Sequence, residues 1–177
     1  MKYQIPDPIL ASIRDFRLPR YAEITNVGLY LDQITRFVNI YLCQIGCAEI
    51  TPSMVSNYVK QKTIPGPVKK AYGVESICYL LFVALVKNVM SMEDIRFLEV
   101  LQRSSYTPAR AYDYFCEEFE NVLQYTFGLK PELSHVGTSQ SREKEILRNA
   151  ILASGQKIYL DTFMRSLRQD MAGEASK

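Results

Sequence analysis

Apolar residues recur at steps of three and four along most of the chain, which is the spacing of helices with one buried face. The pattern predicts helices over residues 8–16, 29–45, 91–104 and 107–127, and a long one from 141 or 142 to about 171. Residues 75–90 are nearly all apolar and predict a helix that is buried on most sides. Gly46 and Gly128 stand where two of these helices should end. The sequence therefore predicts a mostly α-helical protein.

The segment from Ile50 to Lys60 predicts a short helix with a sharp start. Thr51 is a good N-cap residue, and Pro52 suits the first helical position, where its missing N–H has no intrahelical partner. Met54, Val55 and Tyr58 share one face, whereas the opposite face is polar and consists of Ser53, Ser56, Asn57 and Lys60. A long amphipathic helix and a glycine turn come before it. This order is typical of a helix-turn-helix whose second helix is the recognition helix.

A basic turn follows this short helix. Thr63 to Pro67 cannot be helical because two prolines surround a glycine, and residues 68–72 can run extended out of it. We expect a tight wing-like hairpin that carries Lys69 and Lys70. Residues 51–90 contain five lysines and one glutamate, and no carboxylate occurs between Ile50 and Gly73. A polyanion can therefore approach this segment, although an ordinary solvated basic face is the alternative interpretation.

Composition and motifs argue against several other classes of protein. The chain has 177 residues, 47% hydrophobic and 23% charged, which suits a globular protein with a real core. The four cysteines lack CxxC spacing and His135 is the only histidine, so we expect buried free thiols and neither a metal site nor a cofactor. The sequence contains neither a glycine-rich phosphate loop nor a Gly-x-Ser-x-Gly turn, so we expect that the protein is not an enzyme.

Nothing in the sequence predicts a membrane segment. The N-terminus lacks the apolar core of a signal peptide. The longest apolar run, Ile77 to Val86, has about half the length that a bilayer crossing needs. We therefore expect a cytoplasmic protein that makes no membrane contact.

Four segments resemble an uncharacterised bacterial family of small MerR-like proteins, known only as a domain of unknown function. They are Leu-Pro-Arg-Tyr at 18–21, Gly-Leu-Tyr-Leu-Asp-Gln at 28–33, the Ile50 to Lys60 helix, and Pro-Val-Lys-Lys-Ala-Tyr at 67–72. More distantly, Thr51 to Leu101 resembles the DNA-binding head of MerR-type regulators, including the Ser-Met-Glu-Asp-Ile element at 91–95. The resemblance implies a winged helix-turn-helix head with a short basic wing over residues 1–104, and an α-helical C-terminal part over 105–177.

The resemblance also implies a DNA-binding transcriptional regulator whose partner is double-stranded DNA. By position, the residues that would contact DNA are Ser53, Ser56, Asn57, Tyr58, Lys60, Lys62, Lys69, Lys70 and Tyr72. Ser56 and Asn57 stand where MerR-type recognition helices usually have an arginine and an aromatic residue, and the wing is several residues shorter. Asparagine can nevertheless read adenine in the major groove. Tyr58 and Tyr72 suit phosphate contact and core packing equally.

The C-terminal part leaves alternatives open. MerR-type proteins usually form a homodimer through a long helix, for which residues 141–171 and 112–127 are candidates; such a helix can also fold back on its own head. Five aromatic residues can line a pocket for a small-molecule effector or form an ordinary core: Tyr106, Tyr112, Tyr114, Tyr125 and Phe127. The alternative function is a non-catalytic protein-interaction adaptor. It would use the C-terminal helix or the acidic helix 112–127, whose carboxylates at 117–120 we expect on a solvated surface.

Overall fold

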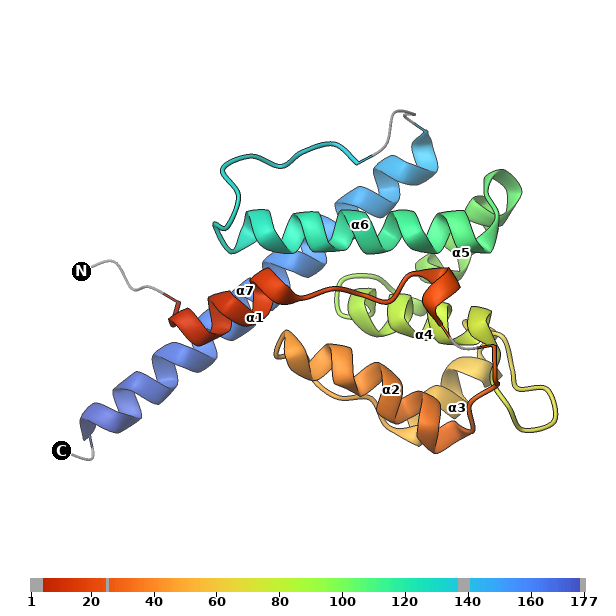
Figure 1. Cartoon of the computed structure of the whole chain (residues 1–177), viewed down its shortest axis with the longest axis horizontal. Helices are drawn as coiled ribbons and strands as arrows, with labels where there is room; N and C mark the ends of the chain where they lie inside the picture. Colours follow the sequence, from red (N-terminus) through yellow and green to blue (C-terminus); the bar gives the residue numbers. More distant parts are fainter. Residues whose placement is uncertain (1–4, 25, 137–140, 176–177) are drawn as a thin grey trace.

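The structure is a computed structural model that describes residues 5–24, 26–136 and 141–175. Within these ranges the chain forms seven α-helices, one 3-10 helix and no β-structure beyond isolated bridges, so the prediction of a mostly α-helical protein is confirmed (Figure 1). The elements are α1 (Asp7–Asp15), η1 (Tyr21–Glu23), α2 (Leu31–Gln44), α3 (Pro52–Lys60), α4 (Val74–Val86), α5 (Met92–Ser105), α6 (Pro108–Thr126) and α7 (Arg142–Ala175).

Helices α6 and α7 cross in close contact, and the C-terminal part of α7 extends beyond the other helices (Figure 1). A methyl group added at Gly155 of α7 would lie 2.7 Å from Val122 Cγ1 of α6, closer than carbon atoms can pack. The glycine therefore permits this close crossing, and α7 continues through it without a break.

The middle of the molecule is α4, which packs against α2 as well as against α6 and α7. Nine of its residues are buried, so the prediction of a helix buried on most sides is confirmed. The core is one cluster that contains Ile34 and Val55 of the predicted head together with Phe119 and Ile151 of the predicted C-terminal part. The boundary at residues 104 and 105 stays a prediction.

Helix α7 folds back against the turn that follows α2. Arg165 Nη2 of α7 donates to the carbonyl oxygen of Gly46 at 2.7 Å, directly after α2. Gly46 has a φ of 69°, which is the left-handed conformation expected of a glycine that ends a helix. A side chain at this position would also meet the Arg165 guanidinium, since an added methyl group would lie 2.9 Å from Nη1.

The carboxylates of α6 do not form the exposed acidic surface that the sequence predicts. Glu118 is fully buried and forms an ion pair with Arg148 of α7 at 3.3 Å. Glu120 forms an ion pair with Arg20 at 2.7 Å. The prediction is wrong for these two residues because α7 and the segment before η1 cover the faces of α6 on which they lie; Glu117 is exposed.

All four cysteines are free thiols, but they are not all buried. Cys78 and Cys116 lie in the core, where burial raises the pKa of both thiols, that of Cys116 to about 12. Cys43 is exposed on the last turn of α2, and its thiol lies 3.0 Å from Glu49 Oε1. The expectation of a buried thiol is wrong for Cys43, because this position of α2 faces outward.

Across the residues that the structure describes, no helix is both long and apolar enough to cross a membrane. Within the same ranges, no three His, Cys, Asp or Glu side chains lie together in a way that could hold a metal ion.

Candidate nucleic-acid interface

The turn between α2 and α3 is fixed by side chains on both sides. Asn39 Nδ2 of α2 donates to the carbonyl oxygen of Ile50, and the Ile50 N–H donates to Asn39 Oδ1, both at 2.9 Å. The next residue, Thr51, accepts the N–H of Met54 on its side-chain oxygen at 3.3 Å, so the predicted N-cap is confirmed. These contacts define both the start of α3 and its orientation relative to α2.

Helix α3 buries one face and leaves the other open. Val55 and Tyr58 face the core, whereas Ser53, Asn57 and Lys60 are exposed and Ser56 is half-buried. The open face borders a shallow hollow of about 440 Å³, which is lined by Leu31, Pro52, Ser53, Ser56, Asn57 and Lys60. The lining offers hydroxyl, amide and ammonium groups, which can hydrogen-bond to nucleic acid bases and phosphates.

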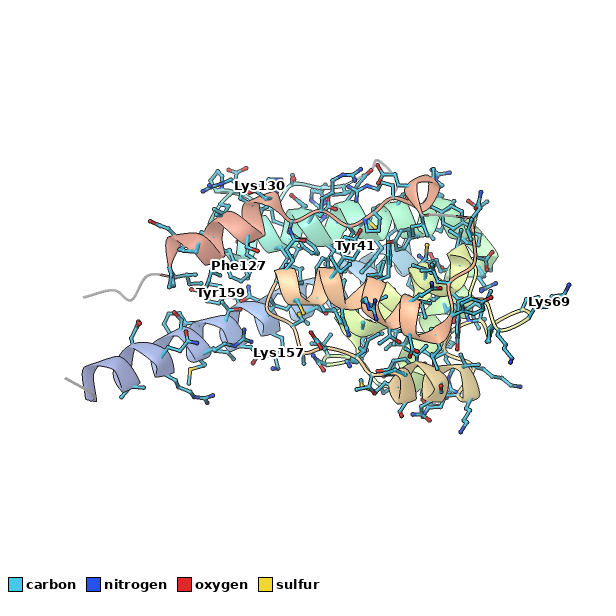
Figure 2. All side chains as sticks on the ribbon, turned by 60° about the horizontal axis from the view of Figure 1, so that its bottom comes forward. Tyr41, Lys69, Phe127, Lys130, Lys157 and Tyr159 are labelled. Carbon is cyan, nitrogen blue, oxygen red and sulfur yellow. The ribbon has the colours of Figure 1, made fainter. Side chains whose placement is uncertain are left out.

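A two-residue hairpin lies next to α3 in the chain. Val68 and Ala71 exchange two backbone hydrogen bonds of 2.9 and 3.0 Å, with Lys69 and Lys70 at the tip. Tyr72 pairs in the same way with Leu29, through hydrogen bonds of 2.8 and 3.0 Å, which ties the hairpin to the chain just before α2. In Figure 2, Lys69 projects from one end of the molecule, whereas Lys130 and Lys157 lie away from that end.

Of the residues predicted to contact DNA, six are exposed, two are buried and Ser56 is half-buried. The exposed group is Ser53, Asn57, Lys60, Lys62, Lys69 and Lys70, which we call the basic ledge. Tyr58 and Tyr72 are each 5% exposed and belong to the hydrophobic core, and burial raises the pKa of both hydroxyls. Their burial favours the core-packing alternative, in which the two rings support the ledge from beneath.

Three lysines of the ledge have unusual backbone conformations. Lys62, Lys69 and Lys70 have φ values of 57°, 49° and 68°, and they are the non-glycine residues with positive φ in the described part of the chain. An L-residue in this left-handed region costs about 1–2 kcal/mol relative to the right-handed one. Such strain concentrates at functional sites, where the surrounding structure holds it in place.

Two residues of this region were missed by sequence reasoning. Arg96 of α5 donates from Nη1 to the carbonyl oxygen of Gln61 at 2.8 Å, which places a guanidinium beside the C-terminal end of α3. Asn39 is the second, through its contacts with Ile50. No motif connects Arg96 to a segment 35 residues earlier, and the only signal for Asn39 is a polar residue within an amphipathic helix.

A family model described as a domain of unknown function, DUF1836, matches residues 19–115, which is more than half of the chain. The chain belongs to the DUF1836 family. The predicted membership in a family of unknown function is thereby confirmed, whereas the likeness to MerR-type regulators stays a prediction. No curated protein and no solved structure matches the chain.

The DUF1836 match contains the whole basic ledge, Asn39 and Arg96, and it ends within α6. Outside it, α7 covers α6.

The five aromatic residues proposed for a ligand pocket separate in the structure. Tyr112 and Phe127 are buried in the core and Tyr125 is exposed, whereas Tyr106 and Tyr114 line a cavity between α5, α6 and α7.

Proposed function

We propose that this protein binds double-stranded DNA as a winged helix-turn-helix transcriptional regulator. In this proposal α3 is the recognition helix and residues 68–72 are the wing. The observation that carries the proposal is the basic ledge, an exposed polar and cationic surface that starts from a helix whose orientation is fixed by Asn39. Helix α7 folds against α4, α5 and α6 rather than over the open face of α3.

The chemistry of the ledge suits a duplex. An α-helix fits the major groove, where Asn57 can hydrogen-bond bidentately to adenine and Ser53 can contact either base edges or phosphate. Lys60 and Lys62, together with Arg96, lie where α3 ends and can bind the phosphate backbone. Lys69 and Lys70 at the tip of the wing can reach phosphates beside the groove. Phosphate contacts provide affinity and orientation, and α3 provides sequence discrimination.

Selection from fragmented genomic DNA tests the proposal. The full chain should retain a limited set of fragments that share a sequence. Asn57→Ala should weaken binding to that sequence by about 1–3 kcal/mol while leaving binding to unrelated duplex unchanged. Asn149→Ala on α7 is the matched control and should change neither, because Asn149 is exposed and bonds within its own helix. Failure to retain any fragment at low salt would refute the proposal.

A homodimer would present two such heads to two half-sites, and we infer that α7 provides the contact. Leu160, Met164, Leu167 and Met171 follow one another at the four- and three-residue steps of a coiled-coil seam. Leu160 and Met171 are 54% and 63% exposed. Asp161 follows Leu160 and Arg168 follows Leu167, so antiparallel pairing would bring Asp161, which forms an ion pair with Lys157 of its own helix, beside Arg168 of the other copy.

Light scattering coupled to size exclusion tests the dimer. The wild type should have twice the mass of one chain, and Leu160→Glu with Met171→Glu should reduce it to a monomer. Phe97→Glu with Val100→Glu removes exposed apolar side chains from α5 instead and should leave the dimer intact. A monomeric wild type at high micromolar concentration would contradict the inference.

The second candidate function is a protein-interaction adaptor. Phe97 and Val100 favour it, because they lie three residues apart on α5 and are 63% and 67% exposed. An adaptor should bring down one stoichiometric protein partner in a nuclease-resistant manner, and Phe97→Ser with Val100→Ser should abolish the capture. A partner that is lost on nuclease treatment would instead indicate a shared DNA fragment.

A further inference from the structure

A cavity of about 470 Å³ lies between α5, α6 and the first turns of α7, and its volume is typical of small-molecule sites. Its apolar lining comprises the buried residues Leu98 from α5, Ala111 from α6 and Leu147 from α7, together with the half-buried Val136. A smaller cavity of about 30 Å³ adjoins it and shares Gln102, Ala111 and Leu147. Apolar side chains from three helices therefore form part of the cavity wall, which a hydrocarbon group can contact.

One wall of the cavity combines two aromatic rings with two cations. The Lys144 ammonium lies 4.8 Å from the centre of the Tyr114 ring and 5.6 Å from that of Tyr106. The Arg110 guanidinium lies 5.7 Å from the centre of the Tyr106 ring. The rings hold these cations at the cavity by cation–π attraction, so the wall presents positive charge to any molecule that enters.

Carboxylates line the same cavity. Asp113 Oδ1 accepts the N–H of Tyr21 at 2.7 Å and is thus engaged with η1. Glu117 is exposed on α6, and Glu143 lies in the first turn of α7. The backbone N–H at the start of α7 and the Ser141 hydroxyl lower the pKa of Glu143. Cationic and anionic side chains therefore surround one apolar cavity.

We propose that this cavity binds a free α-amino acid with a large apolar side chain. Its carboxylate would bind Arg110 and Lys144, its ammonium would bind Glu117 and Glu143, and its side chain would occupy the apolar lining. A simple anion would approach the carboxylates of the cavity, and a simple cation would approach Arg110 and Lys144. A zwitterion satisfies both signs of charge without adding net charge.

This proposal is independent of DNA binding, because ligand binding is measured on the protein alone. Isothermal titration of the full chain with L-phenylalanine and L-leucine should give saturable binding at one site. 3-Phenylpropionate lacks the ammonium, 2-phenylethylamine lacks the carboxylate and glycine lacks the apolar side chain. Each should bind at least about tenfold more weakly than L-phenylalanine, because each lacks one charged or apolar contact with the cavity.

Substitutions locate the site. Arg110→Gln and Lys144→Gln should each weaken binding by about tenfold, measured with whichever of L-phenylalanine and L-leucine binds the wild type more tightly. Arg142→Gln removes the same charge from an exposed neighbour that does not line the cavity and should leave binding unchanged. The proposal is overturned if neither amino acid binds at millimolar concentration, if 3-phenylpropionate binds as tightly as L-phenylalanine, or if binding survives both cavity substitutions unchanged.

Discussion

Asn39 and Ile50 form a reciprocal pair, in which the side-chain amide of one both donates to and accepts from the backbone of the other. Because Ile50 is only 2% exposed, water cannot easily replace these two hydrogen bonds. Asn39→Ala should therefore lower the free energy of unfolding by about 2–3 kcal/mol in urea denaturation. Asn149→Ala removes an exposed amide and should cost no more than about 0.5 kcal/mol. Equal losses in the two variants would show that the pair does not fix the turn.

The tip of the hairpin at residues 68–71 should become more stable when its residues match its backbone. Lys69 and Lys70 both have positive φ, the pattern of a type I′ turn, for which asparagine and glycine are the preferred residues. Lys69→Asn with Lys70→Gly should raise the free energy of unfolding by about 1 kcal/mol. Lys60→Asn within α3 removes one lysine charge at ordinary helical geometry and should bring no gain. If the double variant is less stable than the wild type, the claim that the backbone at Lys69 and Lys70 is strained is wrong.

Two glycines of α7 should respond to alanine in opposite directions. Gly155→Ala introduces a methyl group 2.7 Å from Val122 Cγ1, and overpacking of this kind costs about 1–3 kcal/mol. Gly173→Ala has open space around it and should gain up to about 1 kcal/mol from helix propensity. Thermal unfolding of both variants measures the difference. A stabilising Gly155→Ala would mean that α6 and α7 do not cross as closely as described.

The buried Glu118–Arg148 pair predicts a pH-dependent variant. Burial raises the pKa of Glu118, and Arg148 opposes this rise. Arg148→Met should lower the free energy of unfolding by about 3 kcal/mol at neutral pH. This value is at the lower end of the range for breaking a buried ion pair, because the Arg148 side chain is 18% exposed. A carboxyl whose folded pKa is raised stabilises the fold below its unfolded pKa of about 4 and loses that contribution as pH rises through the folded value.

The cost of Arg148→Met should therefore grow as pH rises, because removing the guanidinium raises the pKa of Glu118 further. Urea unfolding at a series of pH values from about 4 to 8 measures this slope. Adding Glu118→Gln removes the titrating group, so the double variant should lose the extra pH dependence. A cost that does not change with pH in Arg148→Met would contradict the burial of an ionised Glu118.

Local signals in the sequence predicted much of the fold. Thr51 and Ser91 begin helices and Gly46 ends one, and each acts within a few residues of the chain. The buried carboxylates of α6 were not predictable in this way. Their partners Arg20 and Arg148 come from other elements, 100 and 30 residues away, and an acidic helix with unknown neighbours predicts a solvated face.

The candidate site was predictable to a similar depth. The polar face of α3 follows from helical spacing, and the hairpin follows from the prolines around Gly66. Asparagine and glycine are the residues that predict a type I′ turn, and lysine is not. The positive φ values at Lys69 and Lys70 could therefore not be predicted from the sequence. Arg96 reaches the site through tertiary packing alone, as does the burial of Tyr58.

The salt dependence of duplex binding tests the central proposal most directly. The slope of log K against log salt counts the phosphates that a protein neutralises. Lys69→Ala with Lys70→Ala should reduce the magnitude of this slope by up to about two units for each bound head. Lys130→Ala with Lys157→Ala removes the same charge at two positions away from the ledge and should leave the slope unchanged (Figure 2). Binding that ignores salt, or a slope reduced equally by both pairs, would contradict a basic ledge that contacts DNA.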